Sequence, residues 1–201
     1  MDRKIIALFC GSFNPPLFSH FSLAEQLINN NKNIEKVIFV PVSNKYNKDG
    51  LISDEHRFNM LNLICKKNPK FEVSNIEFNS PRQPYTFETL QSMQENYPEH
   101  EIRLIIGTDN LSKLDTWYEI EQLLNRFKVF VLARDEDNIE EIICNHNLLS
   151  NYSSSFVKSN ISIRTNLSSS FVRNEIKNKN SVKYLIPDEV IKYIKKNNLY
   201  I

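Results

Sequence analysis

Short apolar runs alternate with helical patterns along almost the whole chain, and this alternation restricts the fold more than any other feature. Runs rich in Ile, Leu, Val and Phe predict strands, and apolar residues spaced three and four apart predict helices. The predicted strands are residues 4–10, 36–41, 70–74, 102–106, 128–133 and 160–164. The predicted helices are residues 18–30, 53–66, 86–96, 116–125, 136–144, 168–177 and 187–197. This order predicts an α/β fold, a doubly wound parallel sheet with a small C-terminal helical extension.

The length of 201 residues fits one domain of ordinary size. We therefore predict a single domain over residues 1–201, in which residues 160–201 form a C-terminal strand-helix-helix part. The 25 Lys and Arg side chains nearly balance the 24 Asp and Glu side chains, so no overall field favours nucleic acid or a membrane as a partner. The polar run 145–159 predicts a surface loop before the C-terminal part.

The cysteines and histidines are spaced without any metal-ligand or redox pattern. Cys10, Cys65 and Cys144 are odd in number, which fits free thiols in a reducing compartment. The sequence shows no signal peptide and no long apolar span. We expect a cytoplasmic protein without a protein-bound metal, and the sequence leaves the possibility of a homo-oligomer open.

A glycine and two prolines interrupt the chain directly after the first predicted strand. Gly11 allows a close backbone approach, and Asn14-Pro15-Pro16 continues neither a strand nor a helix, so a loop is required here. His20 then falls in the first turn of the next helix, where unpaired N–H groups and the helix dipole favour an anion. We interpret the segment as a phosphate-binding loop, although by itself it is equally compatible with a structural histidine.

Glycine is rare in this chain, and two of its three glycines directly follow apolar strands. Gly11 follows residues 5–9, and Gly107 follows residues 102–106. Because the carboxyl ends of parallel strands share one rim of the sheet, both glycines are expected on that rim, where the backbone can approach a ligand. Glycines that only terminate strands are the alternative.

A second polar stretch, Leu167 to Arg173, provides hydroxyls and a cation at a predicted helix start. Backbone N–H groups, the Ser168 and Ser169 hydroxyls and the Arg173 guanidinium can converge on phosphates there. Neither the Walker phosphate-loop pattern nor the glycine-rich dinucleotide fingerprint occurs. This disfavours kinases and nicotinamide-dependent dehydrogenases.

Together, the two stretches resemble the nucleotidylyltransferase superfamily, whose members pair a loop of the form G-S/T-F-D/N-P-x-H/T-x-x-H with a late I-S-S-T-x-x-R motif. Within it, residues 84–90, 106–123 and 182–200 are similar to three elements of the nicotinate or nicotinamide mononucleotide adenylyltransferases. The resemblance implies a Rossmann-like fold. It also implies an enzyme that transfers AMP from ATP to a pyridine mononucleotide, giving a dinucleotide and pyrophosphate.

Matched position by position, the resemblance assigns roles to residues of this chain. The implied catalytic residues, which contact the phosphates, are His20, Lys48 and Arg173. The implied ATP-binding residues are Gly11, Ser12, Phe13, Asn14, Gly107, Asp109, Arg134, Ser168 and Ser169. The mononucleotide would be bound by Tyr85, Thr86 and Trp117, with the indole ring stacked on the pyridine. Mg²⁺ would arrive on the phosphates of ATP.

Leu17 departs from the pattern, because it stands where the superfamily has its first His or Thr. A leucine side chain cannot donate a hydrogen bond to a phosphate. A nucleotide-binding homologue without catalysis is therefore one alternative, and pantetheine-phosphate adenylyltransferase, which has a similar first loop, is another. Without the resemblance, Trp117 would be assigned to the core. His56-Arg57, at a helix start after Ser53-Asp54-Glu55, is assigned to capping and surface charge and not to catalysis.

Overall fold

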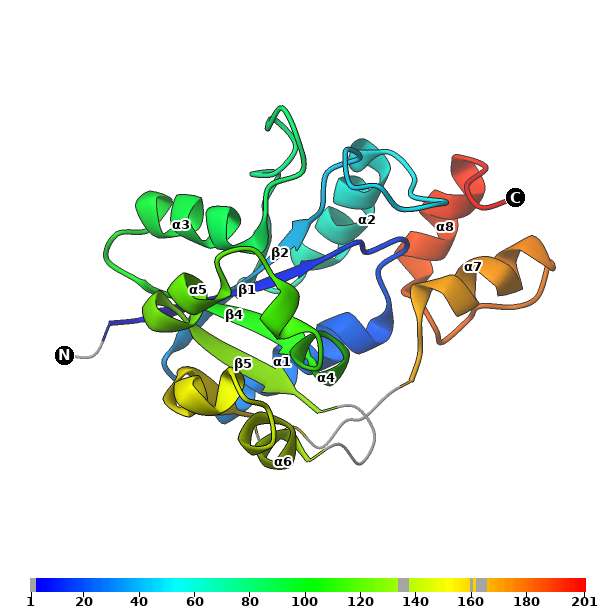
Figure 1. Ribbon diagram of the computed structural model, residues 1–201. Helices are drawn as coiled ribbons and strands as arrows, with labels where there is room; N and C mark the ends of the chain where they lie inside the picture. The colour runs from blue at the N-terminus through cyan, green and yellow to red at the C-terminus, as the bar shows by residue number, and fades with distance from the viewer. Residues whose placement is uncertain (1–2, 134–137, 160, 162–165) are drawn as a thin grey trace.

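The apolar runs of the sequence form one sheet of six parallel strands, as the computed structural model shows (Figure 1). The structure describes residues 3–133, 138–159, 161 and 166–201. The strands are β1 (Ile5–Gly11), β2 (Ile34–Pro41), β3 (Phe71–Val73), β4 (Glu101–Gly107), β5 (Lys128–Leu132) and β6 (Phe156–Lys158). They lie in the order β3-β2-β1-β4-β5-β6, and every neighbouring pair is parallel. The predicted Rossmann-like, doubly wound α/β class is confirmed.

The direction of winding reverses between β1 and β4. From β1 the chain moves outward to β2 and β3, and it then returns to place β4 on the other side of β1. The two strands are paired from Ile5 opposite Glu101 to Phe9 opposite Ile105. In open sheets of this kind, ligands bind beyond the carboxyl ends of the strands at the point of reversal. Gly11 ends β1 and Gly107 ends β4, so both glycines lie on the predicted rim.

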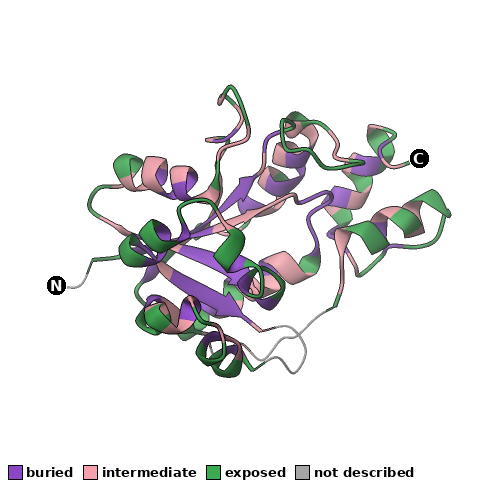
Figure 2. Cartoon of the chain, in the orientation of Figure 1, coloured by how far each residue is buried: buried purple, intermediate pink, exposed green. Residues whose placement is uncertain are grey.

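Helices cover both faces of the sheet, because successive strand residues point to opposite sides. The α-helices are α1 (Phe18–Asn30), α2 (Asp54–Cys65), α3 (Thr86–Asn96), α4 (Thr108–Leu111), α5 (Ile120–Arg126), α6 (Ile139–Cys144), α7 (Ser169–Lys177) and α8 (Asp188–Lys196). Ile6 and Leu8 of β1 belong to a buried cluster with α3, α5 and α6, whereas Ile5 and Ala7 belong to a cluster with α1 and α2. Figure 2 shows the strands buried between these layers.

A third apolar cluster joins the C-terminal helices to the rest of the molecule. Val172 of α7 and Val190 of α8 are buried with Leu17, directly before α1, and with Met60 of α2. The contact between α8 and α2 is visible in Figure 1. This packing brings the first turn of α7 to the loop that follows β1.

Two predicted elements differ from the structure. The helix predicted over residues 116–125 is a short 3-10 helix, η1 (Leu114–Thr116), followed by α5, because Glu119 adopts a left-handed φ of 52° between them. The loop predicted over residues 145–159 is also wrong, because it contains the 3-10 helix η2 (Leu149–Ser155) and β6. The polar serines of this run masked a strand of only three residues.

Several predictions fall on residues that the structure does not describe. The strand predicted over residues 160–164 lies outside the described residues except for Ile161, and Arg134 also lies outside them. Across the part of the chain that is described, no helix is long and apolar enough to cross a membrane.

Candidate active site

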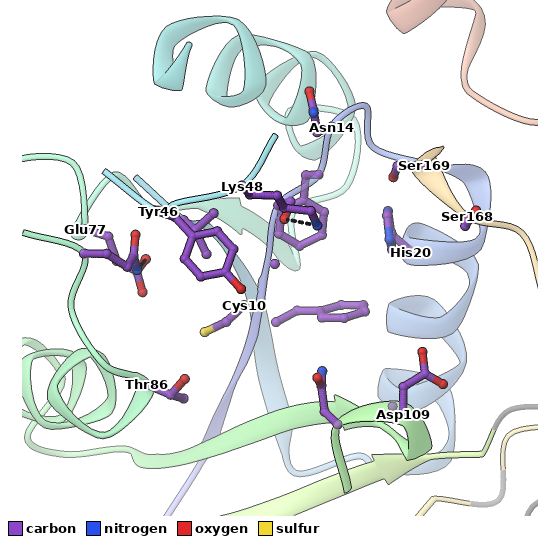
Figure 3. A pocket seen from close by; sticks show the side chains of 18 of the residues that line it. Cys10, Asn14, His20, Tyr46, Lys48, Glu77, Thr86, Asp109, Ser168 and Ser169 are labelled. Atoms are coloured by element: carbon purple, nitrogen blue, oxygen red, sulfur yellow. Dashed lines mark hydrogen bonds between the residues drawn. The ribbon is translucent and has the colours of Figure 1, made fainter. Parts of the chain in front are cut away.

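A cavity of about 1050 Å³ opens beyond the carboxyl ends of β1, β4 and β5. Its size lies at the upper end of the range for small-molecule sites. Every described residue that the sequence assigned to a site lines it (Figure 3). These residues are Gly11, Ser12, Phe13, Asn14, His20, Lys48, Tyr85, Thr86, Gly107, Asp109, Trp117, Ser168, Ser169 and Arg173. The structure therefore brings together segments as far apart in the sequence as Gly11 and Arg173.

The loop after β1 is held from α7. The Arg173 guanidinium donates from Nη1 to the Asn14 carbonyl at 2.9 Å, and the Ser169 hydroxyl donates to the Pro15 carbonyl at 2.8 Å. Ser168 caps α7, because its hydroxyl accepts from the Phe171 N–H at 3.2 Å. The two motifs read from the sequence thus form one continuous structure at the rim of the cavity.

His20 is the third residue of α1, and its ring is fixed by the start of that helix. Nδ1 accepts from the Leu17 N–H at 3.0 Å. The rings of Phe9 and Phe13 pack edge-on against the imidazole, with centroids 5.8 and 5.0 Å away. Because Nδ1 is an acceptor here, a neutral His20 carries its proton on Nε2. The ring can therefore offer a donor from the cavity wall.

Lys48 comes from the loop between β2 and α2 and reaches the first loop. Its ammonium donates to the Ser12 hydroxyl at 3.0 Å, as the dashed line in Figure 3 marks. Partial loss of water around the ammonium, and secondly the Arg173 guanidinium, lower the pKa of Lys48. We call the three cavity-lining residues His20, Lys48 and Arg173 the basic wall. The positive charges of Lys48 and Arg173 are close enough to repel each other. An anion placed there would relieve that repulsion.

Gly11 and Gly107 differ in what surrounds them. A Cβ on Gly11 would lie 3.3 Å from the Phe13 ring, which is tighter than ordinary contact. At Gly107 the nearest atom, the carbonyl oxygen of Leu132, would be 4.0 Å away. The Phe13 ring therefore disfavours any larger residue at position 11. At position 107 a Cβ would make no close contact, and Gly107 lines the cavity.

Another part of the cavity lining is aromatic. Tyr85, directly before α3, is 50% exposed and stacks on Tyr118 with ring centroids 4.4 Å apart and planes 19° apart. The Arg82 guanidinium lies 5.1 Å from the Tyr85 ring. Trp117 follows η1 and packs partly against the core, so it is neither fully exposed nor plain core. We call Tyr85, Trp117 and Tyr118 the aromatic wall.

Tyr118 was missed by the sequence reasoning. No spacing in the sequence links it to Tyr85, because the two residues belong to different segments. Its position directly after Trp117 is the one signal that could have drawn attention to it.

A buried carboxylate supports the segment that leads to the aromatic wall. Glu77 is 3% exposed and accepts from the Gln83 amide at 2.6 Å and from the Thr89 hydroxyl at 2.7 Å. Burial raises the pKa of Glu77, and these two hydrogen bonds oppose that shift. The side-chain oxygen Oε1 of Gln83 in turn accepts from the Ser43 N–H at 2.8 Å. Glu77 therefore ties residues 82–86 to α3 and to the loop after β2, a role that no motif indicated.

Arg57 was assigned to a helix cap with surface charge, and that prediction is wrong. Its side chain is fully buried and donates to the Ser12 carbonyl at 3.2 Å, to the Ile52 carbonyl at 3.0 Å and to Asp54 at 2.5 Å. Ser53 does cap α2. The reason for the error is a long-range contact, since the first loop supplies an acceptor that covers the guanidinium. The Asp54–Arg57 spacing of three was the available signal for a paired cation.

Leu17 takes part in packing at the position where the superfamily has a polar residue. The residue is 1% exposed, and it belongs to the third apolar cluster with Val172 and Val190. Its backbone N–H, and not its side chain, provides the hydrogen bond to His20. The leucine that departs from the motif therefore packs against apolar side chains of the C-terminal helices α7 and α8.

The cysteines of the described residues are free thiols. Cys10, Cys65 and Cys144 are free, and burial raises the pKa of Cys65 to about 12 and that of Cys10 above its ordinary value. Within the same residues, no group of three or more His, Cys, Asp or Glu side chains is placed to hold a metal ion.

The fold and the cavity define a Rossmann-like α/β protein with a cavity beside the loop after its first strand, at the point where the sheet reverses, lined by the Lys48 and Arg173 cations. The chain belongs to the cytidylyltransferase-like family, whose sequence model matches residues 8–175. The family resemblance inferred from the motifs is thereby confirmed.

Named relatives match nearly the whole chain. A probable nicotinate-nucleotide adenylyltransferase of Carboxydothermus hydrogenoformans is 37% identical over 197 residues, which cover 97% of each chain. The nicotinate-nucleotide adenylyltransferase of Bacillus subtilis is 30% identical over 98% of each chain. The enzyme class predicted from the sequence is the class of these relatives.

A solved structure has the same fold. The Plasmodium falciparum nicotinic acid mononucleotide adenylyltransferase complexed with NaAD superposes with a TM-score of 0.81. It is 24% identical and the match covers 98% of this chain and 97% of that one.

Proposed function

We propose that this chain transfers AMP from ATP to nicotinate mononucleotide, giving the deamido dinucleotide and pyrophosphate. The observation that carries the proposal is the meeting of the basic wall and the aromatic wall in one cavity at the reversal point of the sheet. Cations suit a triphosphate, and exposed rings suit a pyridine. The two relatives described above are named as nicotinate-nucleotide adenylyltransferases, one of them as a probable one. These names support the choice of nicotinate over nicotinamide.

The reaction exchanges one phosphoanhydride bond for another. A phosphate oxygen of the mononucleotide attacks the α-phosphorus of ATP, a new P–O–P linkage forms, and the bond to the β-phosphate breaks with its electron pair leaving on pyrophosphate. No covalent bond to the protein is needed. Catalysis then depends on alignment of the two phosphates and on stabilisation of the charge that builds on the leaving group.

The basic wall supplies that stabilisation. His20 would donate from Nε2 to a phosphate oxygen, and Lys48 and Arg173 would offset the negative charge of the triphosphate. The Ser168 hydroxyl, which only accepts within α7, and the N–H groups of the first turn of α7 would add donors near the same phosphates, while Ser169 holds the first loop through the Pro15 carbonyl. Mg²⁺ would be bound mainly by ATP phosphates and water, where it screens charge between the reacting groups.

The remaining residues would hold the two nucleosides. Trp117 would stack on the pyridine ring, with Tyr85 and Thr86 beside it. Gly107 and Asp109, at the end of β4, would face the adenosine part, because the backbone there is open to the cavity. Placing ATP across β1 and β4 with the pyridine toward α3 brings the two phosphates together near the first loop.

A direct assay tests the proposal. Purified protein is incubated with ATP, Mg²⁺ and either nicotinate or nicotinamide mononucleotide, and the products are separated and identified by mass. We expect a dinucleotide and one pyrophosphate per turnover, with the larger kcat/KM for nicotinate mononucleotide. Folded protein that yields no product with either substrate would refute adenylyl transfer, and a larger kcat/KM for nicotinamide mononucleotide would refute the preference.

The same assay separates the alternatives. Phosphopantetheine in the substrate panel tests the related adenylyltransferase class. Calorimetry with ATP tests the non-catalytic homologue that Leu17 suggested, since binding without turnover would support it. The burial of Leu17 in the third apolar cluster accounts for a leucine at this position by packing, so the leucine alone does not favour the non-catalytic homologue.

A further inference from the structure

The side chain of Asn14 joins two distant segments next to the cavity. It is 1% exposed, its Nδ2 donates to the Gly50 carbonyl at 2.7 Å, and its Oδ1 accepts from the Tyr200 hydroxyl at 2.7 Å. Gly50 belongs to the loop that carries Lys48, and Tyr200 follows α8. A buried amide with both ends bonded holds a single orientation.

The partners determine which way the amide faces. A carbonyl oxygen can only accept, so Nδ2 must face Gly50 and Oδ1 must face Tyr200. The Tyr200 hydroxyl must then be the donor. Burial raises the pKa of Tyr200, an effect that the nearby Arg173 and Arg57 cations oppose, so the hydroxyl keeps its proton at neutral pH. Tyr200 thus fixes the orientation of Asn14.

The loop that Asn14 belongs to touches the basic wall at two further points. The backbone carbonyl of Asn14 accepts from the Arg173 guanidinium at 2.9 Å. Two residues earlier, the Ser12 hydroxyl accepts from the Lys48 ammonium at 3.0 Å. Tyr200 also adopts a φ of 62°, a left-handed conformation that an aromatic residue rarely takes. The chain therefore holds an unfavourable backbone conformation that brings this hydroxyl to Asn14.

We propose that Tyr200 is a positioning residue for the reaction: by orienting Asn14, its hydroxyl holds the first loop and the Lys48 loop at the spacing that the reacting phosphates require. The inference rests on the proposed adenylyl transfer. Tyr200 is not among the described residues that line the cavity. It therefore acts through Asn14 and not directly on the substrate.

Tyr193 offers a matched control on the same part of the chain. Its hydroxyl lies 3.0 Å from Nδ1 of His56 and accepts from the Asn59 amide at 3.2 Å. Both partners belong to α2, and neither is among the described residues that line the cavity. Tyr193→Phe therefore removes a comparable, partly buried hydroxyl without touching the first loop.

The test compares kcat and the KM for ATP of the unmodified chain, Tyr200→Phe and Tyr193→Phe at saturating mononucleotide. We expect Tyr200→Phe to lower kcat roughly 10- to 100-fold, as a small misplacement of reacting groups does. Tyr193→Phe should stay within about twofold, while both variants lower the thermal midpoint by similar amounts. Equal activity of the two variants, or a Tyr200→Phe chain that does not fold, would overturn the inference.

A double-mutant cycle asks whether the effect passes through Asn14. In an Asn14→Ala background, Tyr200→Phe should change kcat by less than about twofold, because the partner of the hydroxyl is gone. An equal loss in both backgrounds would also overturn the inference. If the unmodified folded chain shows no turnover, the proposed function fails, whereas turnover that Tyr200→Phe leaves unchanged fails this inference alone.

Discussion

The basic wall and the aromatic wall line one cavity, but their side chains are held in place by different contacts. The basic wall rests on hydrogen bonds between distant segments, such as Arg173 to the Asn14 carbonyl and Lys48 to the Ser12 hydroxyl. In the aromatic wall, two half-exposed tyrosines from separate segments stack on each other and Trp117 packs against the core, while the hydrogen bonds of Glu77 and Gln83 fix the segment before Tyr85.

The difference suggests a division of work. Phosphate chemistry requires donors fixed before the substrate arrives, because reorganisation during the reaction would lose the advantage of a preorganised site. Recognition of an aromatic ring tolerates small shifts, since stacking has a broad minimum. Damage to the basic wall should therefore lower kcat, and damage to the aromatic wall should raise the KM for the mononucleotide.

His20→Ala is expected to have the largest effect on this comparison. It removes a donor that is already oriented by the Leu17 N–H, so we expect kcat to fall about 10²- to 10³-fold, roughly 3–4 kcal/mol. Steady-state kinetics at saturating substrates measures it. His100→Ala is the control. Nε2 of His100 lies 3.4 Å from the Glu35 carboxylate, and neither residue is among the described residues that line the cavity. Similar kinetics for both variants would remove His20 from the mechanism.

Trp117→Ala tests the other wall. Loss of one ring stacked on a base costs about 1–3 kcal/mol, so the KM for the mononucleotide should rise roughly 5- to 150-fold. The KM for ATP should change little. A variant that instead loses kcat with both KM values unchanged would show that the two walls do not divide the work in this way.

Leu17→Thr addresses the point where the chain departs from its superfamily. A hydroxyl at this 1% exposed position would lie among apolar side chains, so we expect the free energy of unfolding to fall by about 1–3 kcal/mol and the turnover not to rise. Urea unfolding and the standard assay measure the two quantities. Increased turnover would mean that the residue at position 17 reaches the phosphates after all.

The fold could be predicted from the sequence wherever local pattern and tertiary environment agree. α1 and α3 begin and end where the apolar spacing placed them, because each has one buried face on the sheet. The prediction failed at Glu119, where a left-handed residue divides two short helices, and at β6, whose three residues follow a run of serines. Neither a single backbone angle nor so short a strand leaves a periodic pattern.

The site could be predicted only as far as its motifs reached. Residues of the first loop and the α1 start, such as His20, and of α7, such as Arg173, carry their chemistry in local sequence. Arg57, Tyr118 and Tyr200 do not, because each acquires its environment from a segment far away in the chain. Contacts of this kind depend on how the elements pack, which a single sequence does not encode in any spacing.

Tyr118→Ala should have a smaller effect than Trp117→Ala. The variant loses the stack on Tyr85, and an exposed aromatic pair is worth about 0.5–1.5 kcal/mol at most. We expect the KM for the mononucleotide to rise by roughly two- to tenfold, measured in the same assay. A rise as large as that of Trp117→Ala would make Tyr118 a direct partner of the substrate and not a support for Tyr85.

Lys48→Arg should have an effect at neutral pH no larger than that of Tyr118→Ala, and it should change the pH profile. Partial desolvation and Arg173 lower the pKa of Lys48, so in the free protein its charge is lost at a lower pH than that of an ordinary lysine. Since kcat/KM reports the free protein, it should fall as the pH rises through that lowered pKa. Bound triphosphate favours the charged form, so the fall in kcat should come at higher pH.

An arginine keeps its charge throughout this range, so the variant should lose the alkaline fall in kcat/KM. At pH 7.5 the altered geometry should cost about 0.5–1.5 kcal/mol of activation free energy, the usual worth of one hydrogen bond. Lys66→Arg, at the exposed end of α2, is the control and should leave the profile unchanged. An alkaline fall that persists in Lys48→Arg would assign the titration to another group and would leave the basic wall without a role for the Lys48 charge.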